Sequence, residues 1–226
     1  IRLIMRLIRF TLALILFCCT NSCSSLDTNR IAPGYVEAYK AAKNAIFGYE
    51  SGLISRDLVN SIPYASLSLK IGKGPKGLLI LESKSKNEEV WVSADEVYLV
   101  TKNGRIISTQ GLINNLTSLI LPSELTNLSK FDKDIVYKYY YSYDFPTLNN
   151  LEVEVVLEDM GIKEVTILGE KKKLTLIEEH IKNSYLGWSV QNSYWIDEDG
   201  FVWKSIQNVS PKLPPISFEV TKKPSI

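Results

Sequence analysis

The sequence predicts an all-β protein, an antiparallel barrel or sandwich of about ten strands with one N-terminal helix packed on it. Two observations lead to this prediction. Short apolar segments with alternating polar residues recur throughout the chain after Pro63. Turn signals separate them at short intervals, and Asn103-Gly104 is the clearest of these because a type I′ turn needs positive φ at both central residues.

The predicted strands follow one another with short connections. They are 66–71, 78–82, 90–93, 97–101, 105–109, 136–144, 151–158, 163–168, 174–181, 194–196, 201–206 and 216–220. The segment 136–144 places four tyrosines on one face, as a half-buried strand would. Segment 174–181 also fits a helical period, so a short helix is the alternative there. Prolines precede segment 216–220, which favours an edge strand because proline cannot donate to a ladder.

Two segments depart from the β pattern. Residues 35–49 have apolar side chains at helical spacing and are rich in alanine, which predicts the N-terminal helix. Residues 112–131 break the alternation, and we expect a short helix there that ends at Pro122 and is followed by a loop.

The first residues have the pattern of a bacterial lipoprotein export signal. Arg6 and Arg9 precede an apolar run at 10–17, which is too short to span a membrane because a span needs about 20 residues. Small or polar residues then precede Cys23, whose thiol we expect to be lipidated after cleavage before it; Cys19 is the second choice. The predicted organisation is a signal peptide at 1–22, a lipid-anchored tether at 23–34 and a single β domain at 35–226.

Composition excludes several chemistries for the mature chain. All three cysteines lie in the leader, so no disulfide, zinc–thiolate site or cysteine nucleophile is expected after it. The chain has 26 Lys and Arg against 25 Asp and Glu, and loss of the leader removes three arginines. This balance provides no basic surface for nucleic acid.

No catalytic or metal site is apparent in the sequence. His180 is the only histidine, which excludes a histidine cluster for a metal. The stretch from Asp197 to Gly200 begins like a calcium loop, but Val202 and Lys204 follow where oxygen ligands would be needed, so we interpret it as a hairpin turn. We therefore predict no metal, no cofactor and no catalytic residues.

Several segments, taken in their order along the chain, resemble a known family. They are Pro63–Ser66, Trp91–Asp95, Leu99–Thr101, Asn103–Ile106, Thr109–Leu112, Asn192–Asp197, Gly200–Ser205, Gln207 and Ser210–Pro215. The set resembles the YjbF/GfcB family of lipoproteins, which is associated with group 4 capsule and related exopolysaccharide loci. The resemblance implies an outer-membrane, periplasm-facing β lipoprotein that serves polysaccharide assembly or export, and it supplies no catalytic residues. Ser24 after Cys23 agrees, because aspartate commonly occupies that position in lipoproteins kept in the inner membrane.

Two functions from different classes follow. The first is a non-enzymatic accessory factor that contacts polysaccharide, export-machinery proteins or both. The alternative is a glycan-active hydrolase that uses acids such as Asp95, Asp197 or Glu158.

The predicted contact surface lies on the hairpin around Asp197–Gly200. Trp195 and Trp203 lie on either side of this turn, and we expect them close to cross-strand register. Lys204 and Gln207 flank the pair, with Arg105 as a neighbour, and these polar groups could bind a glycan or a partner.

Overall fold

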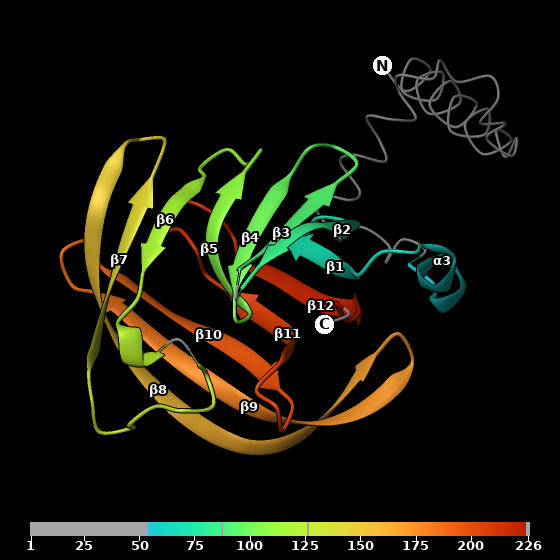
Figure 1. Cartoon of the computed structure of the whole chain (residues 1–226). Coiled ribbons are helices and arrows are strands. Elements are labelled where there is room, and N and C mark those ends of the chain that lie inside the picture. The colour runs from blue at the N-terminus through green and yellow to red at the C-terminus, as the bar shows by residue number, and fades with distance from the viewer. Residues whose placement is uncertain (1–53, 87, 126, 225–226) are drawn as a thin grey trace, which may run out of the picture. The chain divides into compact units, whose positions relative to one another are not determined.

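Twelve antiparallel strands form one continuous sheet that curls into a nearly closed barrel (Figure 1). This computed structural model describes residues 54–86, 88–125 and 127–224. The predicted signal peptide, the tether with Cys23 and the helix at 35–49 lie outside these residues. The strands are β1 (Ser66–Ile71), β2 (Lys76–Ser85), β3 (Glu88–Ser93), β4 (Tyr98–Lys102), β5 (Arg105–Gln110), β6 (Leu116–Ile120), β7 (Tyr137–Tyr143), β8 (Leu148–Ile167), β9 (Glu170–Asn183), β10 (Trp188–Ile196), β11 (Val202–Gln207) and β12 (Ile216–Lys222).

The sheet order is β5-β4-β3-β2-β1-β12-β11-β10-β9-β8-β7-β6. Strands that are consecutive in sequence therefore pair with each other, except β5 and β6, which form the two edges of the sheet. The first strand, β1, pairs with the last strand, β12. The sheet edges β5 and β6 meet where the Leu116 backbone N–H donates to Thr109 Oγ1 at 2.9 Å. The barrel is nearly closed in this way, although no backbone ladder pairs β5 with β6.

A short helix, α3 (Arg56–Ser61), precedes β1. Ser55 caps it, because its hydroxyl accepts a hydrogen bond from Leu58 N at 3.2 Å, and Asp57 lies in the first turn, where negative charge is favoured. The helix ends before Pro63.

Most of the core lies inside the barrel. The four predicted inward tyrosines of β7 are all buried, as expected from their shared face, and they are Tyr137, Tyr139, Tyr141 and Tyr143. Aliphatic and aromatic side chains of the facing strands complete the interior, among them Trp91, Val155 and Ile181. Figure 1 shows the green strands β3 to β6 on one side of the interior and the orange and red strands β9 to β12 on the other.

The structure confirms the all-β class and selects a barrel, but it corrects the predictions for two segments. Residues 116–120, expected to begin a helix, form β6 because they pair with β7. The predicted edge strand at 216–220 is β12, which lies between β1 and β11 in the middle of the sheet. The strand predicted at 174–181 is confirmed over the alternative helix, since these residues belong to β9.

The predicted strands at 151–158 and 163–168 are parts of a single strand, β8. A register shift between Asp159 and Ile162 interrupts its pairing with β9, and Gly161 has φ +72° there. This β-bulge breaks the alternation of side chains, and for that reason the sequence pattern predicted two strands instead of one. The β8–β9 turn is held near α3, since Arg56 donates to Leu168 O and pairs with Glu170, both at 2.9 Å.

Because neighbouring strands are antiparallel, successive turns lie at alternate ends of the barrel. One end, called here the β1 end, holds the start of β1 and the turns after β2, β4, β8 and β10. The segment between β6 and β7, with the 3-10 turn Ser123–Leu125, lies at the same end.

Candidate functional site

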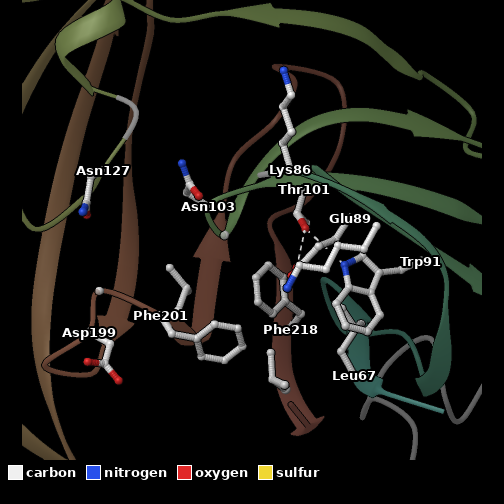
Figure 2. A pocket seen from close by; sticks show the side chains of 15 residues that line it. Leu67, Lys86, Glu89, Trp91, Thr101, Asn103, Asn127, Asp199, Phe201 and Phe218 are labelled. Carbon is white, nitrogen blue, oxygen red and sulfur yellow. Dashed lines mark hydrogen bonds and ion pairs between the residues drawn. The ribbon is translucent and has the colours of Figure 1, made fainter. Parts of the chain in front are cut away.

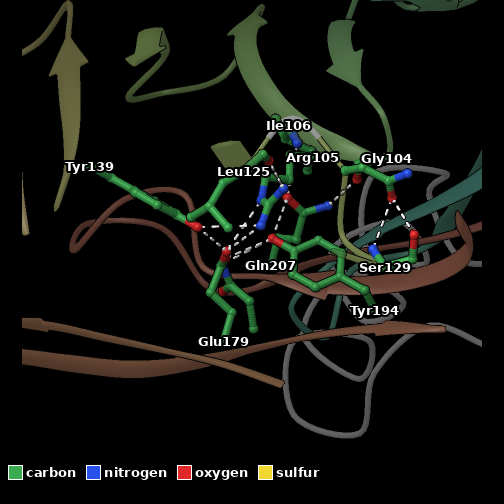
Figure 3. A network of polar contacts seen from close by, with 11 residues as sticks. Gly104, Arg105, Ile106, Leu125, Ser129, Tyr139, Glu179, Tyr194 and Gln207 are labelled. Atoms are coloured by element: carbon green, nitrogen blue, oxygen red, sulfur yellow. Dashed lines mark hydrogen bonds and ion pairs between the residues drawn. The ribbon is translucent and has the colours of Figure 1, made fainter. Parts of the chain in front are cut away.

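A buried polar network crosses the barrel interior from β5 to β9 (Figure 3). The Glu179 carboxylate is its centre: Oε1 accepts from Arg105 Nη2 at 3.1 Å and from the Tyr139 hydroxyl at 2.8 Å. Its other oxygen, Oε2, accepts from the Tyr194 hydroxyl at 2.9 Å and from Asn192 Nδ2 at 3.0 Å. Arg105 Nε also donates to Oε1 at 3.2 Å, so Oε1 accepts three hydrogen bonds and Oε2 accepts two.

The charged pair in this network is almost fully shielded from solvent. The side chains of Arg105 and Glu179 are each 1% exposed. Burial alone would lower the pKa of Arg105, but the nearby Tyr139 and Glu179 raise it above its ordinary value, so the guanidinium stays charged. Within the described residues, every buried side-chain nitrogen or oxygen has a hydrogen-bond partner. Removing one member of such a pair would leave an uncompensated buried charge.

Gln207 on β11 forms hydrogen bonds that join the β4–β5 turn to the opposite wall of the barrel. Its Nε2 donates to Gly104 O, and its Oε1 accepts from Ile106 N, each at 2.9 Å. Gly104 lies so close to β11 that a Cβ built on it would be 2.2 Å from Val202 Cγ2, and its φ is +78°. The turn therefore needs glycine for its backbone conformation and for the close approach.

Two of the predicted contact residues are not on the exposed side of the barrel. Arg105 and Gln207 are buried in the network just described, so the expectation that they contribute to an external contact surface is wrong. Both side chains project into the barrel. The sequence did not predict this, because polar side chains are usually expected on the solvent-facing side of a strand. Their hydrogen bonds give them a structural role in closing the barrel.

The predicted cross-strand pairing of the two tryptophans is also wrong. A bulge between Trp195 and Ile196 places Lys204, not Trp203, opposite Trp195. Trp195 and Lys204 lie on the outer face, where Lys204 Nζ is 5.5 Å from the Trp195 ring centroid and 2.8 Å from Glu219 Oε1.

Trp203 is half-buried and belongs to a separate group of side chains. Its ring meets Phe201 edge to face at a centroid distance of 5.2 Å, and its Nε1 donates to Asp197 Oδ2 at 2.9 Å. Lys172 Nζ lies 4.0 Å from its ring centroid. The structure thus does not bring the five predicted contact residues together.

A pocket of about 480 Å³ opens at the β1 end, next to the Gly104–Val202 contact (Figure 2). We call it the mouth pocket. Its lining comes from β1 to β4, the β4–β5 and β10–β11 turns, Asn127 and β12. Leu67, Trp91, Phe201 and Phe218 form apolar walls, while the polar groups around them are Lys84, Lys86, Glu89, Thr101, Asn103, Asn127 and Asp199.

Glu89 is the polar group of the mouth pocket with a perturbed pKa. Burial raises the pKa of its carboxyl, although Lys84, 3.6 Å away, and a hydrogen bond from Thr101 act in the opposite direction. Thr101 also accepts a hydrogen bond from Trp91 Nε1 at 3.1 Å, which holds the indole in the pocket wall. The pocket therefore combines aromatic surface with oriented donors and acceptors, as small-ligand sites do.

The acids proposed for a hydrolase are not assembled into a site. Asp95 lies in the β3–β4 turn at the end opposite the β1 end, Asp197 lies in the β10–β11 turn at the β1 end, and Glu158 lies along β8. None of the three lines the mouth pocket, where the described carboxylates are Glu89 and Asp199. Sequence reasoning missed Glu89 and placed Asp199 only in a hairpin turn, because barrel closure alone brings β3 and the β10–β11 turn to one pocket.

Over the residues that the structure describes, no group of three or more His, Cys, Asp or Glu side chains could hold a metal ion. In the same part of the chain, no helix has the length and apolarity needed to cross a membrane.

The fold and the pocket define a nearly closed antiparallel barrel domain with a polar network in its interior and a ligand-sized opening at one end. The sequence model of the family described as "Group 4 capsule polysaccharide lipoprotein gfcB, YjbF" matches residues 39–220. The chain belongs to this family, as its sequence motifs predicted.

This chain covers nearly the whole length of two relatives from Escherichia coli K12. The uncharacterized lipoprotein YjbF is 23% identical over 218 residues, covering 93% of this chain and 96% of the relative. The uncharacterized lipoprotein GfcB is 22% identical over 219 residues, covering 93% and 94%. The crystal structure of the hypothetical lipoprotein YmcC from the same organism has a TM-score of 0.66 at 20% identity, covers 91% of this chain and 100% of that one, and shows the same fold.

Proposed function

We propose that this chain is a lipoprotein of the outer membrane, anchored on the periplasmic face, that acts as a non-enzymatic accessory factor in capsule or exopolysaccharide assembly or export. The observation that carries the proposal is the family match over residues 39–220, since that family is one of group 4 capsule polysaccharide lipoproteins. Its partners would be the polysaccharide, export-machinery proteins, or both.

The anchor in this proposal is the acylated thiol of Cys23. The leader pattern before Cys23 and the serine after it support outer-membrane attachment. Stable anchoring by lipid alone needs more than one acyl chain, and the mature chain offers no polybasic segment to assist it. We expect wild-type protein to incorporate labelled palmitate and to fractionate with the outer membrane, whereas Cys23→Ser protein should remain unprocessed or soluble. Outer-membrane fractionation of an unlabelled wild-type protein would contradict the anchor.

A non-enzymatic role is supported by the arrangement of carboxylates. A glycoside hydrolase of the usual kind needs two acids about 5–9.5 Å apart across a bound sugar. The acids first considered lie on separate turns and strands, and Glu89 is committed to Lys84 and Thr101. The raised pKa of Glu89 is the one observation that favours the hydrolase alternative.

A reducing-end assay separates these two functions. Purified protein incubated with the polysaccharide of the producing cells should release no new reducing ends beyond those in a control without protein. Release that disappears in Glu89→Gln protein would establish the hydrolase instead.

A further inference from the structure

We propose that the mouth pocket binds an acidic sugar residue, one that carries a carboxylate beside free hydroxyl groups. This inference rests on the proposed function, because it identifies the part of a polysaccharide that the barrel would hold. It is argued from the size of the pocket, its apolar walls and the opposite charges of its two rims.

The size of the mouth pocket suits one end or a short stretch of a glycan. Its volume of about 480 Å³ lies within the range of small-molecule sites. The β4–β5 turn in the lining is fixed, since Gln207 and the Gly104–Val202 contact hold it in place. A preformed site costs less ordering on binding than a mobile one.

The apolar walls provide surface for the C–H faces of a sugar ring. Phe201 is half-buried, and its ring is fixed edge to face against Trp203 at 5.2 Å. Figure 2 shows Phe201 and Phe218 between the two polar rims of the pocket. Rigid aromatic side chains supply contact area at a low cost in conformational entropy.

The rim formed by β2 and its turn carries two lysines. Lys84 is paired with Glu89 at 3.6 Å, whereas Lys86 forms no ion pair with any described residue. A ligand carboxylate at this rim would gain charge-assisted hydrogen bonds that a neutral sugar cannot form.

The opposite rim presents acceptors and amide groups. Asp199 lies in the β10–β11 turn, where its backbone N–H is held by Asp197 Oδ1 at 3.1 Å, and its carboxylate forms no ion pair with a described residue. Asn127 Oδ1 accepts from Ser129 N and from Ser129 Oγ, each at 2.8 Å, which fixes the orientation of the amide and directs its use as a donor through Nδ2. Carboxylates and amides are suited to sugar hydroxyls.

The two rims together select the ligand. Figure 2 shows Lys86 at one side of the pocket, with its ammonium extended away from the aromatic walls, and Asp199 and Asn127 at the other. The stem of a lysine is flexible enough to turn its ammonium towards a bound ligand. A sugar with a carboxylate at one edge and hydroxyls at the opposite edge satisfies both rims. A neutral sugar leaves the lysine rim unused, and a simple anion leaves the Asp199 rim facing a like charge.

The test uses the full-length lipidated protein in detergent and isothermal titration calorimetry. The probes are tetragalacturonate and a glucuronate-containing hyaluronan tetrasaccharide, with maltotetraose as the neutral comparison. We expect at least one acidic probe to bind, more tightly than maltotetraose. Lys86→Ala should weaken that binding by about 10-fold or more, the loss expected for a charge-assisted hydrogen bond. Lys73→Ala, in the exposed β1–β2 turn at the other end of the barrel, should leave it unchanged.

Failure of both acidic probes to bind would overturn the proposal, as would equal affinity for maltotetraose or an equal effect of Lys73→Ala. Circular dichroism of each variant checks that the fold is intact. If the pocket fails these tests while cells still need the chain for surface polysaccharide, the proposed function stands without this site. If the probes bind but export does not need the chain, the site stands and the proposed function falls.

Discussion

The Arg105 guanidinium on β5 lies 3.1 Å from the Glu179 carboxylate on β9, and the two residues are 74 positions apart in the chain. The pair joins opposite walls of the barrel and is surrounded by tyrosine hydroxyls and amides. Burial raises the pKa values of Tyr139 and Tyr194 well above their ordinary range, with the Glu179 charge adding to the effect, so both remain neutral donors. The barrel therefore depends on a charge pair at its centre.

Arg105→Ala should destabilise the protein by about 3–5 kcal/mol, because it leaves the Glu179 carboxylate buried without its cation. Lys204→Ala is the matched control, since it also removes a cation paired with a glutamate, but on the outer face at 2.8 Å from Glu219. Its cost should be about 1 kcal/mol or less. Urea unfolding measures both losses. Equal losses of unfolding free energy in the two variants would show that the buried ion pair contributes no more to stability than the one on the outer face.

Gly104→Ala should destabilise by about 1–3 kcal/mol from overpacking against Val202, in addition to the strain of positive φ. Gly169→Ala provides the control: its φ is +81°, but a Cβ there would meet nothing within 4 Å. The free energies of unfolding of the two variants should therefore differ by the overpacking alone. If Gly169→Ala is as costly as Gly104→Ala, the close approach of the β4–β5 turn to β11 is not what demands glycine.

Asp197 should make stability dependent on acid pH. Burial would raise its pKa, but hydrogen bonds from Trp203 and Phe201 and the charge of Lys223 outweigh this and hold the pKa below the ordinary value of 3.8. A lowered pKa in the folded state stabilises the protein at neutral pH, and this stabilisation is lost as the pH falls below 3.8 through the folded value.

The stability difference between wild type and Asp197→Asn should thus narrow between about pH 5 and about pH 2. Urea unfolding at several pH values measures it. A constant difference over that range would show that Asp197 is not selectively stabilised in its charged form.

Trp203→Ala should cost about 1–3 kcal/mol, less than a core tryptophan, because the side chain is half-buried on the outside of the barrel. Trp91→Ala, at a site 1% exposed, should cost about 3–5 kcal/mol. Thermal or urea unfolding of the two variants compares the same truncation in two environments. A larger loss of stability for Trp203→Ala than for Trp91→Ala would contradict this prediction. It would show that the contact of Trp203 with Phe201 in the β10–β11 hairpin stabilises the fold more than the buried Trp91 does.

The sequence predicted the parts of the fold that depend on local pattern. Alternation placed the four tyrosines of β7 on a buried face, and Asn103-Gly104 marked a true hairpin turn. Bulges defeated the same reasoning: the one at Asp159–Ile162 split β8, and the one at Trp195–Ile196 moved Trp203 out of register with Trp195. A bulge shifts the alternation by one residue without a reliable sequence signal.

The candidate site could not be predicted from local sequence patterns, for a different reason. The mouth pocket draws Lys86 from one turn, Asp199 from another and Asn127 from the segment after β6. Their proximity follows from barrel closure, which pattern and spacing do not encode. Likewise, nothing in the sequence distinguishes buried Arg105 from Lys204 on the outer face, since both are basic residues within β segments.

The most direct test of the account is the amount of surface polysaccharide on cells that lack this chain and receive either the wild-type or the Cys23→Ser form at equal expression. The account predicts a loss of surface polysaccharide on deletion, recovery with the wild type and no recovery with Cys23→Ser, because the factor must be held at the membrane. Unchanged polysaccharide after deletion, or full recovery with Cys23→Ser, would contradict the role of a lipid-anchored export factor.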